Sequence, residues 1–232
     1  MATHGKKYRK IAEQTDRAKY YELPEAIQFI KDHPGAAFDE TVDVAFRLGL
    51  DPTKSDQSVR GTVSLPHGTG KKVRVIVFAD GPAAEAARAA GADQVGYQDL
   101  IEKVTGGWTD FDVAIATPDA MKEVRKLGKV LGPRGLMPNP KTGTVTTDTA
   151  QAVKQFQAGR VEFRMDRHGN VLVPFGKRSF APESLVENCM AIVEAVRGAR
   201  PAAARGVYIK RCTVSSTMGP GLHVNIKDAV VA

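Results

Sequence analysis

The stretch Pro66-His67-Gly68-Thr69-Gly70-Lys71-Lys72-Val73-Arg74-Val75-Ile76-Val77-Phe78 decides how this chain is divided. Its first part, residues 66–70, consists of small and helix-breaking residues between two apolar runs, which is typical of a connection between structural units. Its second part, residues 73–78, is β-branched and almost continuously apolar, as a strand buried on both faces is. We therefore expect a separate structural unit to begin at residue 68.

Strand and helix patterns alternate downstream of this stretch. The predicted elements are a helix at 82–90 with a proline at its start, a short strand at 94–96, a helix at 98–104, a buried strand at 111–116 and a helix opened by Thr117-Pro118-Asp119. Such alternation implies parallel strands. Residues 68–159 are thus predicted to form a small three-layer, Rossmann-like α/β domain, which ends where Gly159 closes a helical pattern.

The flanking segments alternate with period two instead. Residues 41–50 place Val42, Val44, Phe46 and Leu48 on one face. The other predicted elements are strands at 59–65, hairpins joining 161–165 to 171–175 and 207–215 to 222–226, and helices at 23–33 and 182–196. Half-buried strands of this kind fit an antiparallel sheet with one face left open.

Neither flank has enough strands and helices to form a domain alone. We therefore predict one discontinuous α+β domain, 1–67 plus 160–232, with 68–159 inserted into it. The two chain crossings contain glycine, which predicts a hinge at His67, Gly68 and Gly159.

The net charge of the chain limits the classes of partner that it is expected to bind. The 232 residues carry a net charge of +7, and residues 160–232 hold 11 basic against 6 acidic residues. A basic excess favours a polyanionic partner, either nucleic acid or an anionic membrane surface. No apolar run is long enough to span a bilayer, the first ten residues lack the apolar stretch of a secretory signal, and two cysteines are too few for a disulfide framework. We expect a cytoplasmic, reduced protein.

The motifs of enzymes are incomplete in this sequence. Residues 67–72 resemble the end of a phosphate-binding loop, but Leu65 stands where its first glycine belongs and Lys72 where Ser or Thr belongs. Residues 79–82 lack the glycine pattern of dinucleotide binding. The five histidines and two cysteines show no metal-ligand spacing, so we expect buried apolar cysteines, no metal, no cofactor and no catalytic residue.

The densest motif is a segment punctuated by glycine and proline, residues 128–144. It is predicted to be a tightly specified loop, since neither a long helix nor a central strand tolerates this composition. Gly132-Pro133-Arg134-Gly135 fits the Gly-x-x-Gly of a single-strand RNA clamp, but Pro138 and Pro140 block the second helix that such a clamp needs. We favour a structured surface loop, whose role stays open.

Residues 132–145 of this segment, Gly-Pro-Arg-Gly-Leu-Met-Pro-Asn-Pro-Lys-Thr-Gly-Thr-Val, resemble the signature of the family of ribosomal protein L-one of the bacterial large subunit. Similar strings cover nearly the whole chain: 4–6, 38–44, 48–52, 55–68, 91–93, 116–119 and 216–220. The resemblance implies the same discontinuous two-domain architecture. It also implies a first domain that grips a mobile stalk of 23S rRNA.

Further expectations come from the same resemblance. They are a monomer within the cytoplasmic ribosome that helps release deacylated tRNA from the exit site and represses translation of its own operon mRNA. The expected partners are therefore rRNA, exit-site tRNA and that mRNA, with no membrane. Two alternatives stay open at this point: a small-molecule enzyme built on the inserted domain, and a general nucleic-acid binder with no ribosomal role.

Three segments are candidate rRNA contacts. Aromatic rings stack on bases and hydroxyls bond the 2′-hydroxyl of RNA, while uncharged loops with exposed amides approach the sugar-phosphate backbone closely. Chemistry and resemblance together assign Phe38, Asp39, Glu40 and Thr41, then Ser216, Thr217, Met218, Gly219 and Pro220, and finally Arg164, Asp166, Arg167 and His168. A core position is the alternative for Phe38.

The third segment departs from the family pattern. Arg167-His168-Gly169 replaces a Lys-x-Gly that the family often has after the aspartate, so the individual roles of Arg167 and His168 stay open. Lys177 and Arg178 are weaker candidates, with solvated charge as the alternative.

Overall fold

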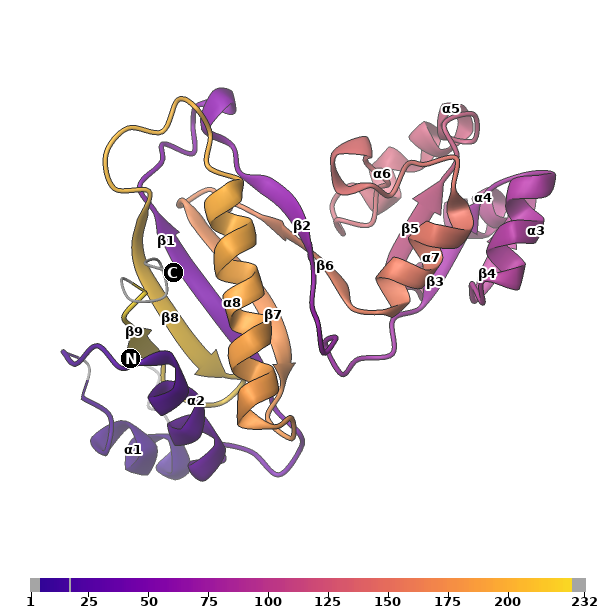
Figure 1. The fold of residues 1–232 in the computed structure, drawn as a ribbon. Coiled ribbons are helices and arrows are strands. Elements are labelled where there is room, and N and C mark those ends of the chain that lie inside the picture. Colours follow the sequence, from indigo (N-terminus) through magenta and orange to yellow (C-terminus); the bar gives the residue numbers. More distant parts are fainter. Residues whose placement is uncertain (1–4, 17, 227–232) are drawn as a thin grey trace. The chain divides into compact units, whose positions relative to one another are not determined.

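The computed structural model describes residues 5–16 and 18–226, which form two compact units (Figure 1). The first unit combines the described residues up to Gly70 with those from Val161 onward, and the second unit is Lys71–Arg160. Each unit has an apolar core of its own. The chain passes between the units at Gly70–Lys71 and at Arg160–Val161.

An antiparallel sheet forms the centre of the first unit. Its strands lie in the order β7-β1-β8-β9, with the bounds β1 Thr41–Leu48, β7 Asn170–Lys177, β8 Ile209–Ser216 and β9 Leu222–Val224. In β1 the side chains of Val42, Val44, Phe46 and Leu48 are buried, as the alternation predicts. The predicted hairpin of β8 and β9 is also present, with Thr213 opposite His223.

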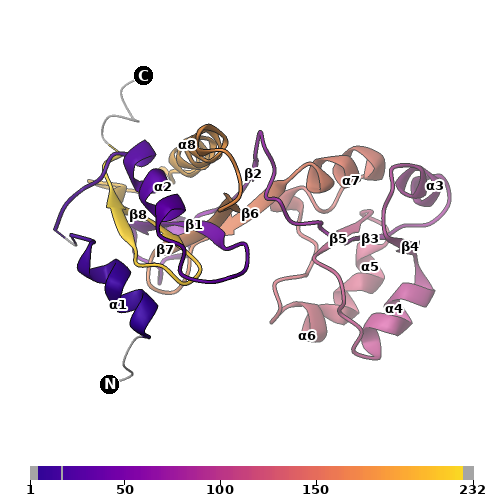
Figure 2. The same ribbon diagram turned by 90° about the horizontal axis from the view of Figure 1, so that it is seen from below.

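Helices cover one face of this sheet. The first unit contains α1 (Lys6–Glu13), α2 (Leu23–Asp32) and α8 (Pro182–Gly198). Both views place α2 and α8 on the same face (Figures 1 and 2). Ala26 and Ile27 of α2 and Leu185 and Ile192 of α8 are buried in the core there. The opposite face is the open one that the half-buried strands predict.

The predicted hairpin of 161–165 with 171–175 is wrong. The short η1 (Ser55–Gln57) precedes β2 (Arg60–Ser64), and β2 pairs with β6 (Arg160–Arg164) in a separate two-stranded sheet. β7 pairs with β1 instead, and a single bridge between Met165 and Val171 joins the two segments. An ion pair between Arg60 and Glu162, 2.6 Å long, supports the pairing of β2 with β6.

The second unit has three layers. Parallel strands lie in the order β4-β3-β5, with the bounds β3 Val75–Phe78, β4 Gln94–Gly96 and β5 Val113–Ala116. Val75 and Val77 pack against α3 (Pro82–Ala89) and α7 (Thr149–Gln157), while Ile76 and Phe78 pack on the other side. That side holds α4 (Gln98–Thr105), α5 (Met121–Val124), η2 (Arg125–Leu127) and α6 (Gly128–Leu131) (Figure 2).

The glycine- and proline-rich segment begins with a helical turn, which the sequence did not predict. α6 occupies Gly128–Leu131, and the loop proper follows, with a short η3 at Pro140–Thr142. Buried Thr142 and Thr144 bond each other and the carbonyl of Asn139, and Val145 forms a bridge to Ala116 of β5. These bonds fix the end of the loop to the sheet. In the described part of the chain, no helix is both long and apolar enough to cross a bilayer.

Candidate nucleic-acid interface

The entry to β1 and the end of β8 lie together, although Thr41 and Thr217 are 176 residues apart in the sequence. The Thr41 N–H donates to Thr217 Oγ1 at 3.0 Å, and the Thr217 N–H donates to the Thr41 carbonyl at 3.1 Å. Antiparallel pairing of Val42 with Ser216 brings the two ends to this point. The structure therefore joins two of the three predicted contact segments into one surface, which we call the loop cluster (residues 38–41 and 216–220).

Two large apolar side chains of the loop cluster are exposed to solvent. Phe38 is 54% exposed and Met218 is 55% exposed. The core position considered for Phe38 is therefore wrong. Beside its ring lies a hollow of about 370 Å³ that Lys31 and Arg178 also line. An exposed ring can stack on a base, whereas the Lys31 ammonium donates to the Phe180 carbonyl and the Arg178 guanidinium lies against Glu40.

Glu40 has a different position from the one predicted. Its side chain is fully buried, so it does not face a partner directly. The carboxylate accepts the N–H of Met218 at 3.0 Å, the N–H of Gly35 at 3.1 Å and the Ser216 hydroxyl at 3.4 Å. Arg178 supplies a cation 3.8 Å away. Glu40 thus holds the loop cluster in shape, and Arg178 is partly buried against it rather than solvated.

Other members of the loop cluster also serve its geometry. Asp39 accepts both the N–H and the hydroxyl of Ser179, and Lys177 donates to Thr41 Oγ1 at 2.8 Å. Ser216 and Pro220 are buried. A Cβ at Gly219 would lie 2.5 Å from Ser216 Oγ, so a larger residue there would displace the Ser216 hydroxyl from Glu40. The exposed residues of the loop cluster are Phe38, Asp39, Thr217 and Met218, and the carboxylate of Asp39 is engaged by Ser179.

The third predicted segment is the turn between β6 and β7, at the other end of the sheet. Asp166 closes this turn by accepting the backbone N–H groups of His168 and Asn170, each at 2.8 Å, and the Asn170 side-chain amide. Burial raises the pKa of Asp166, but these hydrogen bonds outweigh it and leave that pKa below its ordinary value. Arg164, Arg167 and His168 are exposed around the turn. The structure does not bring them to the loop cluster.

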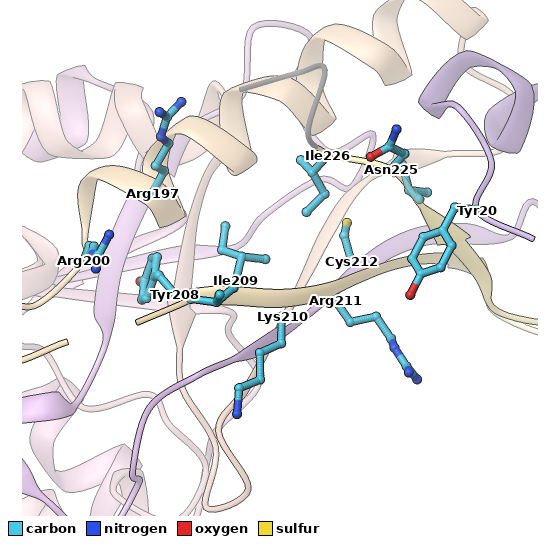
Figure 3. A pocket seen from close by; sticks show the side chains of 12 residues that line it. Tyr20, Arg197, Arg200, Tyr208, Ile209, Lys210, Arg211, Cys212, Asn225 and Ile226 are labelled. Atoms are coloured by element: carbon cyan, nitrogen blue, oxygen red, sulfur yellow. The ribbon is translucent and has the colours of Figure 1, made fainter. Parts of the chain in front are cut away.

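The open face of the sheet connects these two ends. From Thr41 to Arg47 the distance along β1 is about 20 Å at roughly 3.3 Å per residue. Arg47 lies opposite Arg211, and a hollow of about 590 Å³ on this face is lined by Arg47, Lys210, Arg211, His223 and Leu172 among others. Lys210 and Arg211 extend to the opposite side of β8 from Ile209 and Cys212 (Figure 3).

These open-face residues were not among the predicted contacts. The period-two pattern of β1 already placed Arg47 opposite its apolar face, and Lys210 and Arg211 belong to the basic excess of residues 160–232. Their meeting required the register of β1 with β8, which sequence periodicity does not give. Burial, and then the nearby Arg211, lower the pKa of His223, so its imidazole is neutral at pH 7. Burial raises the pKa of Asp43 on the same face, against the opposing effect of Lys177.

A second hollow, of about 390 Å³, lies on the apolar side of β8 (Figure 3). It is lined by Ile209, Cys212 and Tyr208, whose hydroxyl donates to the Val196 carbonyl at 3.0 Å. Both cysteines are buried and free, as predicted, and burial raises the pKa of Cys212 to about 12. Neither thiol is a nucleophile at neutral pH. Among the described residues no three His, Cys, Asp or Glu side chains form a metal cluster.

The predicted hinge residues on the first crossing are tied to the first unit. The buried Asn188 of α8 accepts the His67 N–H at 3.1 Å and donates to the Gly68 carbonyl at 3.0 Å. His67 Nε2 lies 2.7 Å from the Glu187 carboxylate. These bonds hold His67 and Gly68 against α8 of the first unit. Gly70 and Gly159 both have positive φ angles, 70° and 104°, next to the two passages between the units.

The exposed aromatic, hydroxyl and cationic side chains of the first unit are those of a nucleic-acid-binding protein. The family model described as "Ribosomal protein L1p/L10e family" matches residues 30–220. The chain belongs to this family, whose members are structural proteins of the ribosome and not enzymes.

Two relatives match along almost their entire length. The large ribosomal subunit protein uL1 of Protochlamydia amoebophila (strain UWE25) is 53% identical over 100% of this chain and 98% of its own. The protein of the same name from Clavibacter michiganensis subsp. michiganensis (strain NCPPB 382) is 57% identical over 97% of this chain and 98% of its own. Family membership confirms the predicted resemblance and the predicted location in the cytoplasmic ribosome.

Proposed function

We propose that this protein is a structural constituent of the large ribosomal subunit and that its first unit binds the mobile stalk of 23S rRNA. The observation that carries the proposal is the loop cluster, in which mutual hydrogen bonds hold Thr41 against Thr217 beside exposed Phe38 and Met218. Uncharged hydroxyls, one exposed aromatic ring and an exposed methionine suit recognition of an RNA shape rather than attraction of any polyanion.

The proposed contacts differ in role. Phe38 and Met218 pack on a base or sugar. The Thr217 hydroxyl, whose proton goes to the Thr41 carbonyl, accepts a hydrogen bond from a ribose 2′-hydroxyl. Arg47, Lys210 and Arg211 on the open face neutralise phosphates between the loop cluster and the turn at Arg164, Arg167 and His168. Glu40 and Asp166 are positioning residues, because their carboxylates are engaged by the protein itself.

The proposal extends to the two further activities that the family resemblance implies. The discontinuous domain of residues 1–67 and 160–232 would anchor a monomer on the stalk, and the inserted residues 68–159 would move about the crossings as deacylated tRNA leaves the exit site. An operon mRNA that presents a similar RNA fold would occupy the same loop cluster, which would repress its translation.

Substitution in the loop cluster tests the proposal. We expect Thr217→Val combined with Met218→Ala to weaken binding of a stalk rRNA fragment about tenfold, since a hydroxyl hydrogen bond and an apolar contact each contribute about 0.5–1.5 kcal/mol. Filter binding or fluorescence anisotropy measures the affinity, and thermal unfolding checks that the variant is folded. Thr147→Val, at an exposed position of the second unit, is the matched control.

The same titration separates this function from general nucleic-acid binding. Unrelated structured RNA should compete poorly at moderate salt, because purely electrostatic binding weakens steeply as salt rises. Unchanged affinity of the double variant would remove the loop cluster from the interface. Equal competition by unrelated RNA would contradict specific stalk recognition.

A further inference from the structure

The second unit carries its positive charge on one short stretch. Residues 121–141 contain six basic residues and one acidic residue, whereas the remainder of Lys71–Arg160 contains seven basic and nine acidic residues. The second unit therefore consists of one strongly basic segment and a remainder that is slightly acidic. This segment includes the loop to which the sequence assigned no role.

The structure turns most of this segment into one face. α5, η2 and α6 follow one another from Met121 to Leu131, and their Val124, Leu127 and Leu131 side chains are buried in the core below the sheet. Because these apolar residues face inward at helical spacing, the basic residues between them face outward. We call the exposed set the basic face: Lys122, Arg125, Lys126, Lys129 and, on the following loop, Arg134.

The fold leaves much of this charge uncompensated. Lys126 pairs with Glu123, and Lys122 lies 3.8 Å from Asp119 in a mostly exposed contact. Within the described chain, the side chains of Arg125 and Lys129 form no hydrogen bond or ion pair, and Arg134 donates to the hydroxyl of Thr109 rather than to a carboxylate. The charges of Arg125, Lys129 and Arg134 therefore contribute little to the stability of the unit. Their concentration on one face destabilises it slightly, because like charges repel one another.

The backbone beside these side chains is uncrowded. Gly132, Pro133, Arg134 and Gly135 are all exposed, and a Cβ placed at Gly128 or Gly135 would meet no atom within 4 Å. A partner can thus reach the backbone and the cations from the same side. Arginine and lysine around an accessible glycine-rich backbone are the groups that contact phosphate.

We propose that the basic face is a second RNA-binding surface, which contacts the phosphate backbone of duplex RNA without reading its sequence. Its five members, Lys122, Arg125, Lys126, Lys129 and Arg134, include no aromatic side chain, so its chemistry is that of charge neutralisation rather than base stacking. The surface goes beyond stalk recognition by the first unit and does not depend on the loop cluster.

The test uses the full chain and a plain RNA duplex that lacks the stalk structure. We expect Arg125→Gln combined with Lys129→Gln to make the dependence of log affinity on log salt shallower by about 1.8, at roughly 0.9 for each phosphate that the variant no longer neutralises. The matched control is Arg88→Gln combined with Lys103→Gln, which removes the same charge from exposed positions on α3 and α4. Circular dichroism checks the fold of each variant.

The outcomes separate this surface from the loop cluster. A parental salt slope in Arg125→Gln/Lys129→Gln, or an equal change in the control, would overturn the basic face as an RNA contact. Thr217→Val/Met218→Ala should leave duplex binding unchanged while it weakens stalk binding. If the stalk experiment fails but the duplex slope still depends on Arg125 and Lys129, the proposed function falls and the basic face stands.

Discussion

Glu40 illustrates how a single carboxylate can serve an interface without touching the partner. Its two oxygens receive N–H groups from Gly35 and Met218, which belong to segments far apart in the sequence. Burial without these donors would be costly, because an ionised carboxylate loses its hydration. The donors therefore stabilise the charge, and the charge in turn fixes where Met218 is presented.

Replacement of Glu40 by glutamine should uncouple these roles. The glutamine side chain has the same shape as glutamate, but its NH₂ group replaces one of the two accepting oxygens. The backbone N–H of either Gly35 or Met218 then loses its acceptor. We expect Glu40→Gln to lower the free energy of unfolding by about 1–3 kcal/mol and to weaken stalk rRNA binding. Denaturant titration and anisotropy measure the two effects, with exposed Glu183→Gln as the control. Parental values for both measurements would contradict the positioning role.

The burial of the Phe38 side chain could not be predicted from the sequence. A phenylalanine before a strand is compatible with a core position and with an exposed one, and the pattern favours neither. The structure places it outside the alternating run that begins at Thr41, with half of its surface exposed. Glu40 is the converse case, since a charged residue is expected at the surface and only tertiary donors permit its burial.

At the scale of elements, the turn between β6 and β7 depends on the charge of Asp166. Since the folded-state pKa lies below the ordinary value, the stabilisation is complete above the unfolded pKa and is lost as pH falls through the folded pKa. We expect Asp166→Asn to reduce the free energy of unfolding by less than about 1 kcal/mol at pH 7, because Asp166 is only partly buried and water screens its charge. The difference should be smaller at pH 3, because protonation of the carboxylate below its ordinary pKa of 3.8 begins to remove this stabilisation.

Denaturant unfolding of both proteins at the two pH values measures this effect. Asn170→Asp is not a suitable control, since it alters the same bonds. Asp56→Asn, on an exposed part of η1, removes a similar charge away from the turn. A deficit of equal size at both pH values would show that shape rather than charge holds the turn.

The strands themselves were largely predictable, but their partners were not in every case. Period-two burial identified β1, and the short connection between β8 and β9 identified that hairpin correctly. The short connection between β6 and β7 suggested the same arrangement and was misleading, because β6 pairs with β2 instead. Periodicity gives the face that a strand buries, whereas the choice of neighbour depends on packing of the whole sheet.

The helical run of α5, η2 and α6 was predicted only at its start. Its glycine at position 128 and the nearby prolines indicated a loop, yet α6 forms before Gly132 ends it. Burial of Leu127 and Leu131 compensates for the poor helix propensity of glycine there. Local composition was outweighed by core packing, and the exposed side of that same run carries the basic face.

For the whole molecule, the shared core of the first unit predicts that this unit folds without the inserted second unit. Its core contains Phe46 of β1, Val173 of β7 and Leu185 of α8, so residues from both sides of the insertion are mixed throughout. We expect residues 1–70, joined by a short glycine-serine linker to residues 161–232, to fold and to bind stalk rRNA within about threefold of the full chain. Such a ratio corresponds to about 0.6 kcal/mol.

The comparison requires the same RNA fragment and salt for both proteins. Melting of the shortened protein by circular dichroism establishes that it is folded. Loss of stalk binding by a folded protein would contradict the assignment of the rRNA interface to the first unit. In that case residues of the second unit, Lys71–Arg160, would have to contact the stalk rRNA in addition to the loop cluster and the open face.

The central place of β1 has a consequence for biosynthesis. β1 is complete at Leu48, but both of its neighbours, β7 and β8, begin only at Asn170 and Ile209. At about 5–20 residues per second, the nascent strand waits roughly 6–24 s for its first partner. During that interval the second unit, whose parallel strands all lie between the two crossings, can fold to completion. The earliest strand of the sheet is thus among the last to be paired, and its apolar side chains are what a nascent-chain chaperone would encounter.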